Sequence, residues 1–352
     1  MTITSLDNFG HASGSISMSE LRDYYGRSGT VSLNGNLNGG TNPVPSSLPA
    51  SGASTSFSNY RSKNRILKKK GTTETKSSGT FWSPAQSGCV QYHVYVVGAG
   101  GSGGGHSTDS GREKVASGGA AGGTAFRRYS VKDHAISNAS ILIGSGGTGI
   151  SYPASSGAVR SGHNGGNTIF NPNGSGTTIS AIGGSRGFGG RQGAIDATVT
   201  STLPVGENST SVTIGAWGTV PASLGGSGSG GESNYTGGNG PGLSVGSDHS
   251  GATGGGAPNL GSGGKNGPYV GASGYAAGSR SDAPTKPSEW GSDVSNTFQG
   301  GFAVQHSSGS AGGAGNGYLG AGGGASASES GSGNSGNGGS GAIFVTYYEI
   351  NT

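Results

Sequence analysis

The sequence predicts an all-β protein: a small antiparallel β-sandwich framework carries glycine-rich, polyglycine-II-like coils and long loops, after a small N-terminal docking module. Three observations lead to this prediction. One segment, Val90 to Val97, alternates in the manner of a strand. Glycine makes up 80 of the 352 residues, against about 7% in an average protein. Many of these glycines recur at every third position, so we expect backbone rather than large side chains to fill much of the interior.

The clearest strand runs from Val90 to Val97 and passes directly into Gly98. Its β-branched and aromatic residues at even positions alternate with Gln91, His93 and Tyr95, which is the pattern of a half-buried strand. Between the expected strands, no segment has the helical period that a crossover between parallel strands requires, so we expect antiparallel pairing. Further short strands are expected at 124–131, 139–143, 168–170, 177–182, 210–214 and 342–348.

Glycines spaced by three suggest a helix with three residues per turn, the geometry of polyproline-type coils. Backbone groups of such a coil point outward and need partners, and a face without side chains lets neighbouring coils approach closely enough to supply them. Collagen is excluded because the registers break every few triplets and the chain has only 13 prolines. Chance triplets in a Gly/Ser-rich loop stay open as an alternative. The series are 98/101/104, 184/187/190/193, 261/264/267, 309/312/315, 317/320/323 and 333/336/339.

Three regions follow from composition: an N-terminal module at 1–60, a basic linker at 61–79, and a glycine-rich β/polyglycine-II domain at 80–352. In the first region Ser17 precedes Glu20 at the spacing of a capping box, which predicts a short helix ended by Gly26. A similar hexapeptide returns at 56–61, and a brief strand is expected at 30–33. The apolar residues of the two copies are docking candidates: Ile16, Met18, Leu21, Tyr24, Tyr25, Phe57 and Tyr60.

Composition argues against several classes of function. Most of the excess positive charge lies between Arg61 and Lys76, so we interpret it as a solvated linker or a contact to an acidic protein, and we do not expect nucleic acid binding. The lone Cys89 excludes an internal disulfide, and no run is long enough for a membrane span. Gly98 to Gly103 matches G-x-G-x-x-G but lacks the helix that a dinucleotide site needs. We therefore expect no cofactor and no enzyme activity.

Aromatic residues on glycine-supported loops are the candidates for recognition, because such rings stack on sugars or act as protein hot spots. We expect about half of these rings to fill gaps in the fold instead. Ser281 to Trp290 is the one glycine-free, charged and proline-bearing segment of the C-terminal half, which favours an exposed binding loop. The six receptor-binding candidates are Trp217, Tyr235, Tyr269, Tyr275, Trp290 and Tyr318.

The S-G-x-I-S-[MF]-S-x-L-R pattern at 13–26 resembles modules of bacteriophage tail-fibre and virion structural proteins. Residues 51–61 share it more loosely, with one extra residue and without the Ile and Leu. The opening F-W-S-P-A followed by V-V-G-A-G-G-S-G-G-G, and the closing G-G-S-G-A-I-F-V-T-Y-Y-E-I at 338–350, resemble the glycine-rich domains of the same proteins. In composition the domain also resembles the adhesins of T-even phages. The resemblance implies a non-enzymatic fibre or adhesin subunit on the virion.

Such a subunit would attach to other virion proteins through its N-terminal module and contact a host glycan or outer-membrane protein through its loops. The resemblance to tail fibres also implies a homotrimer, while the resemblance to glycine-coil adhesins leaves a monomer as the alternative. A structural head, neck or decoration fibre without a receptor is the alternative. An ice-binding or cell-wall glycine-rich protein is a third possibility, although the residues between the glycines are too mixed for it.

Overall fold

The fold is described here from a computed structural model. It covers residues 67–79, 88–107, 114–131, 139–154, 159–172, 178–191, 194–195, 219–220, 223–244, 250–272, 276–306, 310–328 and 331–350. The predicted N-terminal module with its helix, its strand and all seven docking candidates lies outside these residues, as does the strand expected at 210–214.

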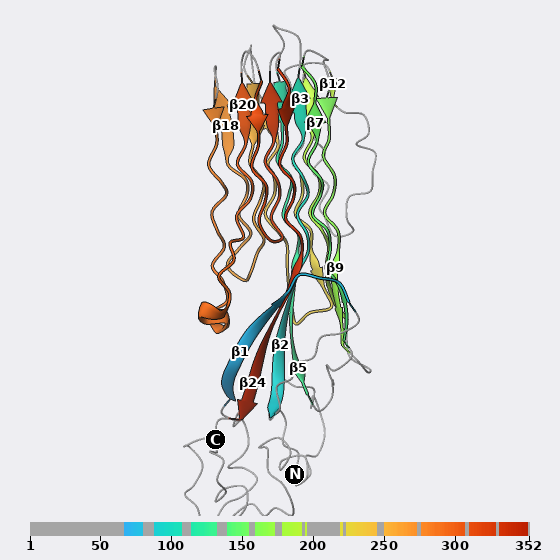
Figure 1. The fold of residues 1–352 in the computed structure, drawn as a ribbon, viewed down its shortest axis with the longest axis vertical. Helices are drawn as coiled ribbons and strands as arrows, with labels where there is room; N and C mark the ends of the chain where they lie inside the picture. Colours follow the sequence, from blue (N-terminus) through green and yellow to red (C-terminus); the bar gives the residue numbers. More distant parts are fainter. Residues whose placement is uncertain are drawn as a thin grey trace, which may run out of the picture.

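A five-stranded antiparallel sheet forms one end of the molecule (Figure 1). Its order is β1 (Leu67–Thr75), β24 (Ala342–Ile350), β2 (Cys89–Val97), β5 (Thr124–Ser130) and β15 (Ser233–Tyr235). A second sheet, in the order β14 (Gly228–Ser229), β10 (Ile179–Ala181), β9 (Thr168–Asn171) and β6 (Ser140–Leu142), packs on one face of the first. Together they form the antiparallel sandwich that the sequence predicts.

The interior of the sandwich comes from one face of each strand. Tyr92, Val94 and Val96 of β2 are buried with Phe170 of β9 and Ile179 of β10. Burial of each large apolar side chain contributes about 1.5–3 kcal/mol. The period-two pattern of β2 therefore selects the face that meets the second sheet, as expected from its sequence.

The basic segment is where the structure departs from the predicted domain boundaries. Residues 67–75 are not a linker but the edge strand β1, which pairs with β24 from Leu67 opposite Ile350 to Thr75 opposite Ile343. A β-bulge between Lys69 and Gly71 interrupts the register. Lysines on an edge strand discourage pairing with other chains. This role accounts for the run of lysines, so no linker is needed to explain it.

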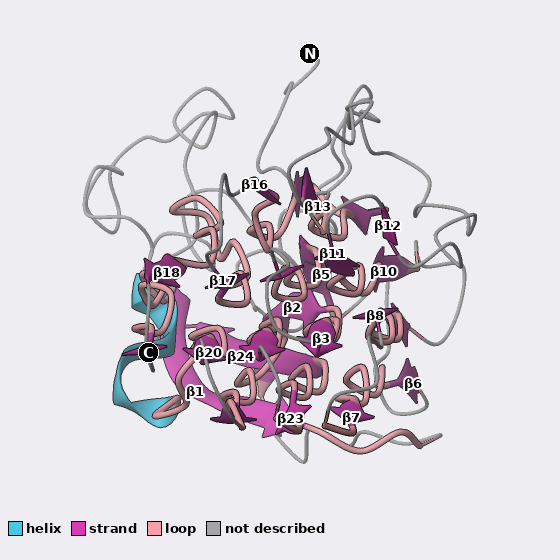
Figure 2. Cartoon of the chain, turned by 90° about the horizontal axis from the view of Figure 1, so that it is seen from above, coloured by secondary structure: helices cyan, strands magenta, loops and turns pink. Residues whose placement is uncertain are grey.

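Polyglycine-II-like coils leave the sandwich and run side by side to the opposite end (Figure 1). Viewed along their axes in Figure 2, they appear end-on as an array of loops. The coils include 98–104, 117–123, 143–150, 161–167, 182–188, 223–227, 236–242, 254–259, 264–268, 278–287, 294–303, 314–318, 321–325 and 335–341.

The coil at 98–104 shows how these coils are held together. Successive N–H groups donate to three different neighbours, and each direction repeats after three residues, as a three-residue turn requires. Coil 117–123 accepts from Gly98, Gly101 and Gly104, and coil 161–167 accepts from Ala99 and Ser102. Coil 335–341 accepts from Gly100 and Gly103, and all these N–H to oxygen distances are 2.9–3.1 Å.

The carbonyl oxygens of the same coil accept bonds from three other neighbours. Gly184 and Gly187 of coil 182–188 donate to the oxygens of Ala99 and Ser102. Gly147 donates to Gly100, and Gly323 donates to Gly101. This coil is thus surrounded by others on all sides. Hydrogen bonds between coils satisfy its buried N–H and C=O groups, and the interior is built from backbone because the chain has few apolar side chains.

Glycine is needed in the coils because neighbouring backbones touch. A Cβ atom at Gly100 would lie less than 3.0 Å from backbone atoms of Ala321 and Gly322, and one at Gly103 would meet Gly324 equally closely. The series 98/101/104 lies in a coil as predicted. Gly336 and Gly339 also lie in a coil and donate to Gly324 and Ala321 of coil 321–325, but Gly333 lies in the short strand β23 (Gly333–Asn334). The series 317/320/323 is different, because Gly320 has a φ of 67° in the turn between two coils.

Asparagine side chains replace the missing neighbour where a coil lies at the surface. The Oδ1 atom of Asn167 accepts the N–H of Gly183, and Oδ1 of Asn164 accepts that of Arg186. Asn239 does the same for Gly225.

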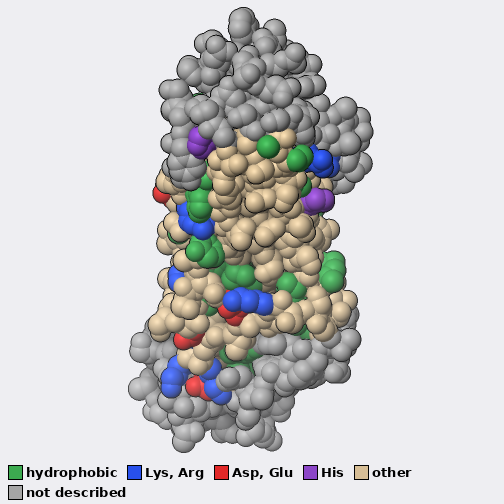
Figure 3. All heavy atoms as spheres, turned by 45° about the horizontal axis from the view of Figure 1, so that its top comes forward, with side chains coloured by type: hydrophobic (Ala, Val, Ile, Leu, Met, Phe, Trp, Pro, Cys, Tyr) green, Lys and Arg blue, Asp and Glu red, His purple; other side chains and the backbone are tan. Residues whose placement is uncertain are grey.

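Figure 3 shows one face of the molecule, on which the described surface consists largely of backbone and small polar groups, with charged side chains scattered across it.

Short strands join the coils at the end opposite the sandwich, where β3, β7, β12, β18 and β20 are labelled in Figure 1. Most pair antiparallel, but β17 with β4, β20 with β22, β22 with β3 and β21 with β23 are parallel. This corrects the expectation of antiparallel pairing alone: between β20 and β22, for example, the described residues form two coils, 314–318 and 321–325, joined by a turn. The bounds are β3 (Gly105–Ser107), β4 (Lys114–Ala116), β7 (Ser151–Tyr152), β8 (Val159–Arg160), β11 (Gly189–Arg191), β12 (Ala194–Ile195), β13 (Thr219–Val220), β16 (Leu243–Ser244), β17 (Ser250–Thr253), β18 (Tyr269–Ala272), β19 (Ala276–Ala277), β20 (Val304–His306), β21 (Gly312–Gly313), β22 (Ser326–Ser328) and β23 (Gly333–Asn334).

Candidate functional site

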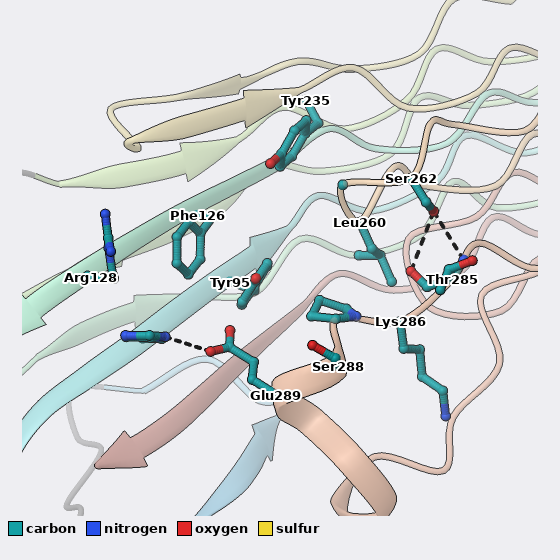
Figure 4. Close-up of a pocket in the computed structure, with 13 residues that line it drawn as sticks. Tyr95, Phe126, Arg128, Tyr235, Leu260, Ser262, Thr285, Lys286, Ser288 and Glu289 are labelled. Carbon is teal, nitrogen blue, oxygen red and sulfur yellow. Dashed lines mark hydrogen bonds and ion pairs between the residues drawn. The ribbon is translucent and has the colours of Figure 1, made fainter. Parts of the chain in front are cut away.

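A pocket of about 440 Å³ lies at the junction between the five-stranded sheet and the coils (Figure 4). One wall comes from β2, β5 and β15, and the other from the turn at 260–262 and from 285–289. The lining residues are His93, Tyr95, Phe126, Arg128, Tyr235, Leu260, Gly261, Ser262, Thr285, Lys286, Pro287, Ser288 and Glu289.

Three aromatic rings from neighbouring strands form the sheet side of the pocket. Tyr95 and Phe126 are cross-strand partners with ring centroids 4.5 Å apart. Tyr235 comes from the edge strand β15, where it lies opposite Thr124. All three rings are partly exposed, so the sheet presents apolar ring surface to whatever enters the pocket.

The other wall belongs to 281–290, the segment predicted to be an exposed binding loop; Asp282, Thr285 and Ser288 are exposed, but Trp290 is not. The 3₁₀ helix η2 (Ser288–Asp293) lies against the sheet and carries Trp290, which is fully buried. The Trp290 ring stacks on Phe344 with centroids 4.4 Å apart and meets Tyr95 edge-on at 5.2 Å. Trp290 therefore cannot contact a receptor in this fold.

This packing also changes the interpretation of β2. The odd-numbered face of β2, expected to be the more exposed one, is covered by 281–298. Val97 is buried with Trp290, Val294 and Phe298, and Tyr95 packs against the same cluster. Both faces of the strand therefore contribute to the core.

Glu289 ties the segment to the sheet through its carboxylate. Its Oε2 atom lies 2.6 Å from Nδ1 of His93 and 2.6 Å from the hydroxyl of Tyr348 (Figure 4 shows the His93 contact). The Gln91 side-chain nitrogen lies 2.7 Å from Nε2 on the other side of the His93 ring, so both ring nitrogens have a polar neighbour.

The carboxylate is held in its ionised form. Burial is the largest single influence and raises the pKa of Glu289, but the hydrogen bond and charge interaction with His93, with the hydrogen bonds from Tyr348 and Tyr95, together outweigh it, so this pKa lies below its ordinary value. Burial, together with the nearby Glu289 charge, raises the pKa values of Tyr95 and Tyr348 well above 10.0. Both phenols therefore stay protonated and act as hydrogen-bond donors.

Charged groups of β1 hold the far end of the same segment. Lys69 Nζ lies 2.7 Å from the Asp293 carboxylate and donates to the carbonyl of Trp290 at 3.0 Å. The Thr72 N–H donates to Asp293 at 2.9 Å. The Lys69 bond first, and then the Thr72 N–H, lower the pKa of Asp293. These contacts give part of the basic run a structural role.

The remaining receptor candidates lie in different places. Tyr235 lines the pocket. Tyr269 is 55% exposed in β18, at the end of the molecule opposite the sandwich, and Tyr318 is 44% exposed beside the turn that follows its coil. The Arg280 guanidinium lies 4.7 Å from the centre of the Tyr318 ring. Trp217 and Tyr275 lie outside the described residues.

The sequence did not single out Phe126, Arg128, His93 or Glu289 as pocket residues. Phe126 and Arg128 lie inside the strand that was expected at 124–131, and alternation within that strand could have placed both on one face. Nothing local connects Glu289 to His93, because 196 positions separate them.

Among the described residues, no group of three or more His, Cys, Asp or Glu side chains is placed to hold a metal ion. Over the same residues, no helix combines the length and the apolar character that a membrane crossing requires. A comparison of the chain with protein-family models finds no matching family, and a comparison with curated proteins finds no match.

Proposed function

We propose that this protein is a non-enzymatic virion fibre or adhesin subunit of a bacteriophage. In this proposal the N-terminal module attaches it to other virion proteins, and the far end of the coil bundle contacts a host glycan or outer-membrane protein. The proposal rests on the sequence resemblance and on one structural relationship. It also includes the homotrimer that the resemblance implies, which light scattering of the purified protein would test.

That relationship is the pairing of Leu67 with Ile350 at the sandwich end. The chain enters and leaves the described body at this end, so residues 1–66 connect to it there. The coils then carry the short strands and their connections to the opposite end (Figure 1). Attachment at one end with presentation at the other is the arrangement that an adhesin requires.

Tyr269 is the best-placed of the described receptor candidates. It lies on β18 at the presenting end, and its ring is more than half exposed. An exposed aromatic ring on a rigid support offers contact area at low cost in conformational entropy. Tyr318 is exposed too, but it lies next to the turn at 319–320, where Gly320 approaches Val97 of β2.

The test replaces the presenting end in the phage that encodes this chain. Residues 269–277 are exchanged for Gly/Ser, and the matched control is Leu142→Ser, which changes an exposed apolar residue of β6 at the sandwich end. We expect the first exchange to lower adsorption to the host, and the control to leave it unchanged, while both proteins are incorporated into particles as judged by immunoblot. Normal adsorption with the first exchange would overturn the adhesin proposal and favour a structural fibre.

A further inference from the structure

We propose that the junction pocket is a binding site for a single neutral pyranose unit, distinct from the presenting end of the bundle. A volume of about 440 Å³ falls within the range of small-molecule sites, about 300–1,000 Å³. Figure 4 shows the pocket between the sheet and the segment at 285–289.

The aromatic wall matches the apolar face of a sugar ring. Tyr95, Phe126 and Tyr235 come from three adjacent strands and are all partly exposed. A pyranose ring carries axial C–H groups on one face, and these pack on aromatic surface, as other flat apolar groups do. Tyr235 adds a hydroxyl at the edge of the sheet, which gives the wall one polar end (Figure 4).

The opposite wall supplies hydroxyl and backbone groups suited to a polyol. Ser262, Thr285 and Ser288 line it, and Ser288 is exposed. Ser262 and Thr285 bond to each other, the Thr285 N–H donating to the Ser262 hydroxyl at 3.1 Å. An apolar wall facing a few positioned polar groups is the usual composition of a small-molecule site.

The charges around the pocket favour a neutral ligand. Oε2 of Glu289 is already bonded to His93 and Tyr348. Arg128 pairs with Glu232 at 2.8 Å, and Lys286 Nζ donates to the Val294 carbonyl. An anion or cation would have to compete with these existing partners, whereas a sugar hydroxyl can add to them without displacing charge.

The pocket is preformed, because both of its walls are anchored elsewhere. The sheet wall is continuous with the sandwich core, and the other wall is held by the buried Trp290 and by Glu289. Binding therefore orders few groups, which lowers its entropic cost. The inference stands apart from the proposed function: a structural fibre without a receptor would still carry this pocket.

The experiment is a saturation-transfer-difference NMR titration of the full chain. The sugar probes are the methyl glycosides of glucose, mannose, galactose and N-acetylglucosamine. The comparison probes are p-cresol, which is aromatic, and inorganic phosphate, which is anionic. We expect at least one glycoside to bind, with its ring C–H protons receiving the strongest saturation.

Variants assign that signal to the pocket. Tyr235→Ala and Phe126→Leu should each weaken the bound glycoside about tenfold, or about 1.4 kcal/mol. Tyr269→Ala, at the opposite end of the molecule, should leave its affinity unchanged, and thermal unfolding of each variant checks that it is folded. Phe126→Leu keeps an apolar side chain in place, so it tests the loss of the ring should Tyr235→Ala fail to fold.

The proposal is overturned if no glycoside binds, if only p-cresol or phosphate binds, or if glycoside affinity is unchanged in both folded pocket variants. Failure here leaves the adsorption experiment untouched, since that experiment replaces residues at the other end of the bundle. Success here with normal adsorption would assign the sugar site to a protein that is not the adhesin.

Discussion

The carboxylate of Glu289 lies 2.6 Å from Nδ1 of His93, although 196 positions separate the two residues in the chain. The pair joins the central strand β2 to the segment that closes the junction pocket. It connects a strand to a segment that the sequence predicts as a separate, exposed loop. The contribution of this contact to the free energy of unfolding can be measured.

Loss of the Glu289 charge should weaken the protein in a pH-dependent way. The folded-state pKa of Glu289 lies below its ordinary value of 4.5, so its contribution is present above about pH 4.5 and is lost as pH falls through the folded pKa. Glu289→Gln should lower the free energy of unfolding by about 1–3 kcal/mol at pH 7. Thermal unfolding at a series of pH values should show the difference from wild type shrinking below pH 4.5. A difference that stays constant down to acid pH would contradict the role of the charge.

Alanine at Gly100 should disrupt the coil bundle. Its Cβ would overlap the backbone of Ala321 and Gly322, and neither can move without breaking main-chain hydrogen bonds to further coils. We expect a loss of about 3 kcal/mol or more in the free energy of unfolding. Gly313→Ala is the matched control, because nothing lies within 4 Å of its Cβ position. Chemical denaturation compares the two, and equal stabilities would contradict close coil packing.

Removal of a surface asparagine should cost less, but measurably. In Asn167→Ala the Gly183 N–H loses its acceptor, and we expect a loss of about 0.5–1.5 kcal/mol. Asn167→Asp keeps an oxygen in the same place and should stay near wild type. Hydrogen exchange of the Gly183 amide gives a local reading: faster exchange in the alanine variant alone is expected, whereas unchanged protection would show that water replaces the side chain fully.

Truncation of Trp290 should release the segment that carries it. The ring is fully buried against Phe344, Phe298 and Tyr95, and Trp290→Ala should cost about 3–5 kcal/mol. A glutamate-specific protease should then cut after Glu289 faster than in wild type. Tyr318→Ala, which removes an exposed ring, serves as the comparison, and equal cleavage rates in the two variants would show that Trp290 does not hold the segment.

Short sequence patterns predicted the strands and coils whose backbone geometry repeats every two or three residues. Alternation in β2 identified the sandwich strand and its inner face, and glycines spaced by three identified coils such as 98–104, because each pattern reports a backbone geometry directly. The same patterns could not give β1, whose lysines resemble a linker until β24 lies beside it. Nor could they give the pocket, because Trp290 and Glu289 occur in a charged, proline-bearing segment whose burial depends on a sheet formed by distant residues.

The pairing of Leu67 with Ile350 has a mechanical consequence. If residues before Leu67 are tethered and the far end of the bundle is gripped, tension runs along β1 against β24. Antiparallel hydrogen bonds lie perpendicular to that direction, so the ladder is sheared and its bonds share the load instead of opening one after another. The lysine-bearing edge strand β1 would then transmit the tension to the rest of the protein.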